Sequence, residues 1–355
     1  MATATATGAA SDVGAATAAG AASAAGTGGA TTATLGRRTP GLVPVTETMR
    51  TSERHPPEPP PSSSSDGDRE RDAAPRGATR AVWAFWRLLG SELRLTFRRP
   101  RNLAMLAVLA LVPVVVGVAL RIAGGSGGPG DEMGGIIADV AGNSLMLTFV
   151  SFSFLVLLLM PVAVSVVAGD SIAGEAGGGT LRYLLAAPAG RTRLLVVKYL
   201  NAVVYAYAVT AVVALSALVT GVVLFPAGDV TLLSGTTISF AEGLVRIAIA
   251  VGYVGAGMAA LAAIALAVST FTEVPIGAIA GTLVLVIVCQ VLRAIPDLDV
   301  IAPYLLPTWF TNFDAVLRSP IDTGALGEGL LAFGAYIALF GSIAWARFSG
   351  KDITS

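Results

Sequence analysis

The strongest constraint on this chain is a set of long stretches that contain no charged residue. A helix that crosses the roughly 30 Å hydrocarbon core of a bilayer needs about 20 apolar residues, at about 1.5 Å of rise per residue. Such stretches occur at 102–120, 140–169, 199–228, 247–272, 274–292 and 329–346. They predict an all-α membrane protein with six transmembrane helices, near 103–122, 144–168, 199–224, 244–268, 275–292 and 329–346.

The composition excludes several other classes of protein. Only 13% of the 355 residues are charged, against about 25% in typical soluble proteins. Cys289 is the single cysteine and His55 the single histidine, so neither a disulfide framework nor a Cys/His metal site can form. The sequence G-x-x-x-x-G-K-[ST] is absent, and the predicted spans contain no histidine or acidic residue for catalysis. We therefore expect no enzymatic activity and no cofactor or metal in this chain.

The basic residues beside the predicted spans are unevenly divided between the two sides. Because cytoplasmic loops retain lysine and arginine, twelve residues against four place both termini in the cytoplasm. We expect a multi-pass protein of the plasma (inner) membrane. The cytoplasmic side holds Arg80, Arg87, Arg94, Arg98, Arg99, Arg101, Arg182, Arg191, Arg193, Lys198, Arg347 and Lys351, and the other side holds Arg121, Arg246, Arg293 and Arg318.

The N-terminal 78 residues differ from the rest of the chain. Residues 1–35 are almost entirely Ala, Thr, Gly and Ser, and residues 56–75 are rich in Pro, Ser and charge. Neither stretch can bury enough apolar surface to offset the entropy lost on ordering. We expect 1–78 to be a disordered cytoplasmic tail and 79–355 to be the membrane domain, with Met49 as an alternative start of the chain.

An amphipathic helix is predicted at 81–99, before the first span. Its apolar residues recur at spacings of three and four, and its arginines fall on another face. This pattern favours a helix that lies flat in the cytoplasmic headgroup layer and is broken from the first span by Pro100. The alternative is a plain extension of the first span. The apolar face holds Val82, Trp86, Leu89, Leu93 and Phe97, and the polar face holds Arg87, Ser91, Arg94 and Arg98.

The long inner loop, 169–198, carries the most informative pattern. Thr180 can cap a short helix over 181–187, which Pro188 and Gly190 end. A second helix begins near Arg191 and continues into the third span. The short helix has an apolar face on which a soluble partner could press; this face holds Leu181, Leu184 and Leu185.

This loop resembles the signature loop of type-2 ATP-binding-cassette (ABC) exporter permeases. The pattern E-x-x-x-G-T-L-x-x-L-L-x-x-P-x-x-R is followed by a lysine seven residues on, Lys198. The resemblance covers about 80–355 and implies a six-helix permease with an elbow helix at 81–99. The residues implied to couple to the ATPase are Glu175, Gly179, Thr180, Leu181, Arg182, Leu184, Leu185, Pro188 and Arg191.

The resemblance also implies the partners of the chain. These are a separate ABC ATPase that holds ATP and Mg, a second permease subunit forming a homo- or heterodimer, and membrane lipids, with no nucleic acid. The outer segment 293–328 is interrupted by Pro303 and Pro307, so it cannot be a full span. In the resembled family this segment forms short re-entrant helices, and Tyr304, Trp309 and Phe310 favour the membrane interface. A secondary transporter and a structural membrane protein remain the alternatives.

Overall fold

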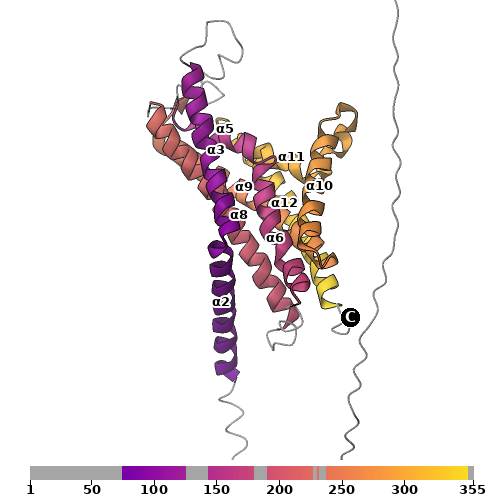
Figure 1. Ribbon diagram of the computed structural model, residues 1–355. Helices are drawn as coiled ribbons and strands as arrows, with labels where there is room; N and C mark the ends of the chain where they lie inside the picture. Colours follow the sequence, from indigo (N-terminus) through magenta and orange to yellow (C-terminus); the bar gives the residue numbers. More distant parts are fainter. Residues whose placement is uncertain (1–73, 125–142, 180–189, 227–229, 232–236, 351–355) are drawn as a thin grey trace, which may run out of the picture. The chain divides into compact units, whose positions relative to one another are not determined.

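The computed structural model describes residues 74–124, 143–179, 190–226, 230–231 and 237–350 (Figure 1). The long helices are α2 (Ala74–Arg98), α3 (Pro100–Gly124), α5 (Met146–Leu155), α6 (Leu159–Gly177), α8 (Arg191–Leu224), α9 (Phe240–Phe271), α10 (Pro275–Arg293) and α12 (Thr323–Ser349). Three short helices, η1 (Pro296–Tyr304), α11 (Leu306–Phe310) and η2 (Thr311–Leu317), link α10 to α12. Strands β1 (Val230–Thr231) and β2 (Thr237–Ile238) pair in antiparallel fashion before α9.

Six of the described helices, α3, α6, α8, α9, α10 and α12, are long and apolar enough to cross a membrane. The chain is therefore a multi-pass helical membrane protein, as the charge-free stretches predict. In α9, 72% of the most apolar window is buried, against 17% in α3, α10 and α12. Helix α9 is thus the core of the bundle, and α6, α8 and α12 pack around it.

Helix α9 can occupy the centre because its side chains are small where its neighbours approach. A Cβ atom on Gly255 would lie 2.4 Å from the ring of Tyr207 on α8, and one on Gly257 would lie 3.0 Å from the ring of Phe333 on α12. Small residues let helix backbones come close in a membrane, where packing rather than hydrophobicity joins helices. The glycine and alanine residues of α9 therefore serve as helix contacts.

The predicted single span 144–168 is wrong. Helix α5 ends at Leu155, a turn follows, and α6 begins at Leu159 and continues to Gly177. Pro161 explains the break, because proline has no N–H and its ring clashes with the carbonyl four residues earlier. That carbonyl, Leu157 O, instead accepts a hydrogen bond from Gln290 Nε2 of α10 at 3.3 Å.

Helix α2 is separated from α3 at Arg99, as Pro100 predicts, and the two helices follow one another in Figure 1. The position of α2 in the headgroup layer stays a prediction, and the structure adds contacts of this helix with α8. Helix α2 runs along the first turns of α8, where the Arg193 guanidinium lies 5.9 Å from the centre of the Phe85 ring. Further along, Asn201 Nδ2 donates to Thr96 Oγ1 at 2.9 Å. Polar contacts of its inner face with α8 therefore set the direction of α2.

The segment between α10 and α12 folds back onto the bundle as short helices. Arg293 Nη1 donates to Pro307 O at 3.0 Å, and Tyr253 Oη of α9 donates to Trp309 O at 2.8 Å. Tyr304 is exposed, which suits the expected interface position, but Phe310 is buried. The interface prediction for Phe310 is wrong because its ring packs beside Phe333 in the core.

The predicted N-terminal tail, 1–78, lies outside the described residues except for its last part. Residues 74–78 belong to the first turns of α2, so the helix begins before the predicted boundary at 81. The other predicted spans agree with α3, α8, α9, α10 and α12, each of which extends beyond its prediction at one or both ends. Charged residues close to a helix end limit the prediction to the apolar part, although the helix itself continues.

Candidate functional site

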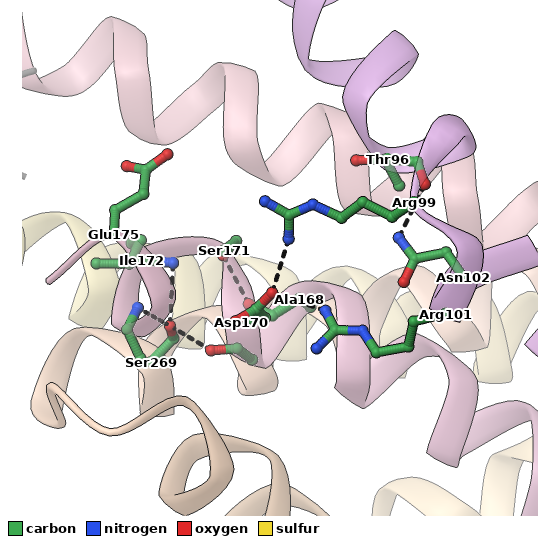
Figure 2. Close-up of polar contacts among 12 residues, drawn as sticks. Thr96, Arg99, Arg101, Asn102, Ala168, Asp170, Ser171, Ile172, Glu175 and Ser269 are labelled. Carbon is green, nitrogen blue, oxygen red and sulfur yellow. Dashed lines mark hydrogen bonds and ion pairs between the residues drawn. The ribbon is translucent and has the colours of Figure 1, made fainter. Parts of the chain in front are cut away.

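Charged side chains from α2, α3, α6 and α8 meet at one place in the bundle. Helices α2, α3, α6 and α8 line there an open cavity of about 430 Å³. We call this group of residues the polar junction; Figure 2 shows part of it. Its ionisable and amide members are Glu92, Arg99, Arg101, Asn102, Asp170, Glu175, Lys198 and Asn201.

Two arginines from the α2–α3 break bind one carboxylate of α6. Arg99 Nη1 donates to Asp170 Oδ2 at 2.8 Å, and Arg101 Nη2 donates to the same oxygen at 2.7 Å. Figure 2 shows both guanidinium groups reaching Asp170 from the α2–α3 side. The arginine side chains are 56% and 47% exposed and that of Asp170 is 12% exposed. The carboxylate therefore holds the break between the two helices against α6.

A buried lysine joins three helices at the other side of the cavity. Lys198 of α8 has a side chain that is 3% exposed, and its Nζ lies 2.5 Å from Glu175 Oε1 of α6 and 3.8 Å from Glu92 Oε2 of α2. A lysine is almost never buried without an anionic partner, because the charge loses its hydration. The two glutamates therefore make the burial of Lys198 possible and fix α8 to α6 and α2.

Two asparagines complete the contacts between α2, α3 and α8. Asn102 Nδ2 donates to Thr96 O and Asn201 Nδ2 donates to Thr96 Oγ1, each at 2.9 Å. Tyr205 Oη donates to Asn102 O at 3.3 Å, and its ring packs against Phe97 of α2. Both asparagines are buried, and among the described residues neither Oδ1 atom has a hydrogen-bond partner.

The polar junction is tied to the central helix through a serine. Ser269 Oγ of α9 accepts hydrogen bonds from Ile172 N at 3.2 Å and Ala173 N at 2.9 Å, and it donates to Gly169 O at 2.7 Å. All three backbone groups belong to α6, and they flank Asp170 in the sequence. Gly169 also allows α10 to come close, because a Cβ atom there would lie 3.2 Å from Ile279 N. These contacts with α9 and α10 therefore fix the part of α6 that carries its acidic side chains.

The described residues contain three of the nine residues predicted to couple to an ATPase. Glu175 binds Lys198, Gly179 lies after α6 with a φ of 68°, and Arg191 Nη1 at the start of α8 donates to Ser349 O of α12 at 2.8 Å. The structure therefore brings together two charged residues of the signature pattern, Glu175 and Lys198. The other six predicted residues, Thr180, Leu181, Arg182, Leu184, Leu185 and Pro188, lie outside the described residues.

Sequence reasoning missed the role of Asp170, Arg99 and Arg101. The sequence analysis counts the two arginines only as basic residues beside the spans, and it assigns no role to Asp170. A signal existed, because the arginines flank Pro100 and an acidic residue is rare within an apolar helix. Such an acid needs a cation nearby, and the helix break provides two.

The ion pairs, hydrogen bonds and close packing of the polar junction are suited to holding helices together and to binding a charged group. Among the described residues, no group of His, Cys, Asp and Glu is arranged to hold a metal ion. Residues 135–354 match the family model described as "Protein of unknown function (DUF2705)". The matched region contains α6 and α8 but not α2 or α3. Comparison with curated proteins finds no match.

Proposed function

The chain belongs to the DUF2705 family of proteins of unknown function, and we propose that it is the membrane-spanning permease subunit of a type-2 ABC exporter. The observation that carries the proposal is the pairing of Glu175 with Lys198 across the ends of the signature loop. In this function the loop is the contact for a separate ATPase. The ion pair passes a movement of the loop to the helices that line the translocation pathway.

Both ends of the loop are attached to the bundle, as a coupling element requires. Its first end follows α6, which Ser269 joins to the central helix α9. Its second end is the start of α8, where Arg191 donates to Ser349 O and Thr192 Oγ1 accepts a hydrogen bond from Trp345 Nε1 at 3.1 Å. A displacement of residues 180–189 therefore acts on α6, α8, α9 and α12 together.

The source of energy in this proposal is outside the chain. The sequence has no P-loop, so ATP and Mg would be held by the partner ATPase. The loop offers that partner apolar side chains, and apolar anchors supply most of the binding energy in such contacts. The exporter would act as a dimer of permease subunits in the plasma (inner) membrane, with both termini in the cytoplasm.

A secondary transporter is the second candidate, and one observation favours it. Helix α6 extends to Gly177 and carries Asp170 and Glu175, whose side chains are 12% and 24% exposed. Buried acids can carry protons or hold ions in transporters driven by an ion gradient. Both acids are paired with cations of α3 and α8, which fits a structural junction better than a site that releases an ion in each cycle.

The deciding experiment captures the partner of the loop. A photo-crosslinking amino acid replaces Leu184 in the full-length protein, expressed in its own host, and the crosslinked product is identified by mass spectrometry. We expect a protein that contains a P-loop. The same residue type at Leu331, which is exposed on the span-length helix α12, is the control and should capture no ATPase.

The variants Leu184→Asp and Arg182→Ala then test the function. Leu184→Asp should prevent co-purification of the ATPase with the permease and the stimulation of ATP hydrolysis by the permease. Arg182→Ala should weaken co-purification and stimulation less, because charges at the rim of an interface mainly affect association rates. A crosslinked partner without a P-loop would contradict the exporter. Transport by the purified chain along an ion gradient, without ATP, would establish the secondary transporter instead.

A further inference from the structure

The cavity of the polar junction has hydrogen-bonding capacity that the described residues do not use. We propose that it binds the headgroup of a membrane phospholipid that bears a phosphate and a primary ammonium group, as phosphatidylethanolamine does. The proposal depends on the chain being a membrane protein and on the residues of the cavity. It does not depend on the exporter function, and either proposal can fail without the other.

The mouth of the cavity carries a positive charge. Two guanidinium groups, Arg99 and Arg101, share a single oxygen of one carboxylate, Asp170, so the three charges sum to +1. Each guanidinium has five N–H donors in a planar arrangement that suits phosphate oxygens. Both arginine side chains are about half exposed, so a phosphate can reach them from the membrane surface.

The opposite wall carries a negative charge. Lys198 lies between Glu175 and Glu92, and these three charges sum to −1. Lys198 is only 2% exposed, whereas the two arginine side chains are about half exposed. A ligand with an anion at one end and a cation at the other matches the two ends of the cavity.

The amide oxygens of two buried asparagines favour a cation that can donate hydrogen bonds. Asn102 is 2% exposed and Asn201 is 4% exposed, and the Oδ1 atom of each has no hydrogen-bond partner among the described residues. Buried polar atoms are nearly always hydrogen-bonded, so these two acceptors favour a ligand that donates. A primary ammonium has three N–H donors, as the lysine ammonium has, whereas the trimethylated nitrogen of choline has none.

The exposed arginines and the buried asparagines lie in the order in which an entering lipid headgroup would place its phosphate and its ammonium. In phosphatidylethanolamine the ammonium is the terminal group, and the phosphate lies nearer the glycerol and the acyl chains. The ammonium would therefore reach the buried asparagines while the phosphate stays at the arginines. Two apolar residues, the exposed Leu95 and the half-buried Pro275, are among those that line the cavity. Its volume of about 430 Å³ lies within the usual range of small-molecule sites, about 300–1,000 Å³.

The test varies the headgroup and keeps the acyl chains constant. The full-length protein is reconstituted in nanodiscs with phosphatidylethanolamine, its N-methyl and N,N-dimethyl derivatives, or phosphatidylcholine, and the retained lipid is counted by native mass spectrometry. We expect retention to fall stepwise with each methyl group, to about one-tenth for phosphatidylcholine, since hydrogen bonds to charged groups are worth about tenfold or more in affinity. Equal retention across the series would overturn the proposal and indicate that water fills the cavity.

Two arginines at opposite ends of α3 provide matched variants. Arg101→Gln should lower phosphatidylethanolamine retention about tenfold, whereas Arg121→Gln, at an exposed position at the other end, should leave it unchanged. Equal effects would overturn the assignment of the phosphate to Arg101. Soluble phosphoethanolamine at the same concentration should not displace the lipid, and displacement would show that the ligand is a soluble zwitterion instead. If Arg101→Gln fails to fold, the methylation series on the parent protein still decides.

Discussion

Removing the charge of Lys198 tests the polar junction most directly. The variant Lys198→Met keeps the length of the side chain but removes a cation that lies 2.5 Å from Glu175 Oε1 and 3.8 Å from Glu92 Oε2. The side chain is 3% exposed, so the methionine can fill the same space. The change therefore isolates electrostatics from packing.

The size of the effect follows from how deeply the three charges are buried. Removing one partner of a buried ion pair costs about 3–5 kcal/mol, because the remaining charge has lost its hydration. Here Glu175 and Glu92 keep 24% and 19% of their side-chain exposure, so water can partly hydrate them. We expect Lys198→Met to lower the free energy of unfolding by about 2–3 kcal/mol. Adding Glu175→Gln should restore about 1 kcal/mol or more of this loss.

The assay is equilibrium unfolding of the purified full-length protein in mild detergent, titrated with sodium dodecyl sulfate and followed by tryptophan fluorescence. Arg318→Met is the control, because it removes one charge of an exposed pair with Asp322, whose atoms are 3.8 Å apart. Exposed pairs contribute about 0–1 kcal/mol. If Lys198→Met destabilises the protein no more than Arg318→Met, Lys198 does not hold the three helices together as argued above.

Two further predictions concern the contacts of the central helix. Ser269→Ala should lower the free energy of unfolding by about 1–3 kcal/mol, because the three buried hydrogen bonds between Ser269 and the backbone of α6 are lost. Ser342→Ala, whose exposed hydroxyl bonds within its own helix, should change it little in the same detergent titration. Gly329→Ala should displace the Tyr253 hydroxyl, which would lie 1.9 Å from the new Cβ. We expect its melting temperature to be several degrees lower than that of the control Gly334→Ala, where no atom lies within 4 Å of the new Cβ.

The sequence predicted the membrane-spanning helices well, because each depends on its own composition. A charge-free stretch of sufficient length has to be a helix in a bilayer, since every backbone group must be hydrogen-bonded within it. The same reasoning failed where a single residue decides the geometry. Pro161 lies inside an apolar stretch with no charge nearby, so hydropathy gave no sign that α5 and α6 are separate helices.

The polar junction was only partly predictable for a different reason. Glu175 and Lys198 belong to a recognisable local pattern, but their pairing with Glu92 depends on how α2 packs along α8. The packing of Arg99 and Arg101 on Asp170 joins residues about 70 positions apart in the sequence. Such contacts arise from the packing of whole helices, which single-sequence periodicity does not specify. The one signal in the sequence is that charged residues are rare within the apolar helices.

The links of α6 to its neighbours differ in their physical character, and this difference has a consequence for movement. Its link to α9 consists of buried hydrogen bonds to Ser269, which salt screens little. Its link to the α2–α3 break depends on arginines that are about half exposed, so salt screens that attraction much more. The α2–α3 contact is therefore the one that can open at the lowest cost. Opening it would free the α2–α3 break from α6, while Lys198 and Asn201 of α8 would still hold α2.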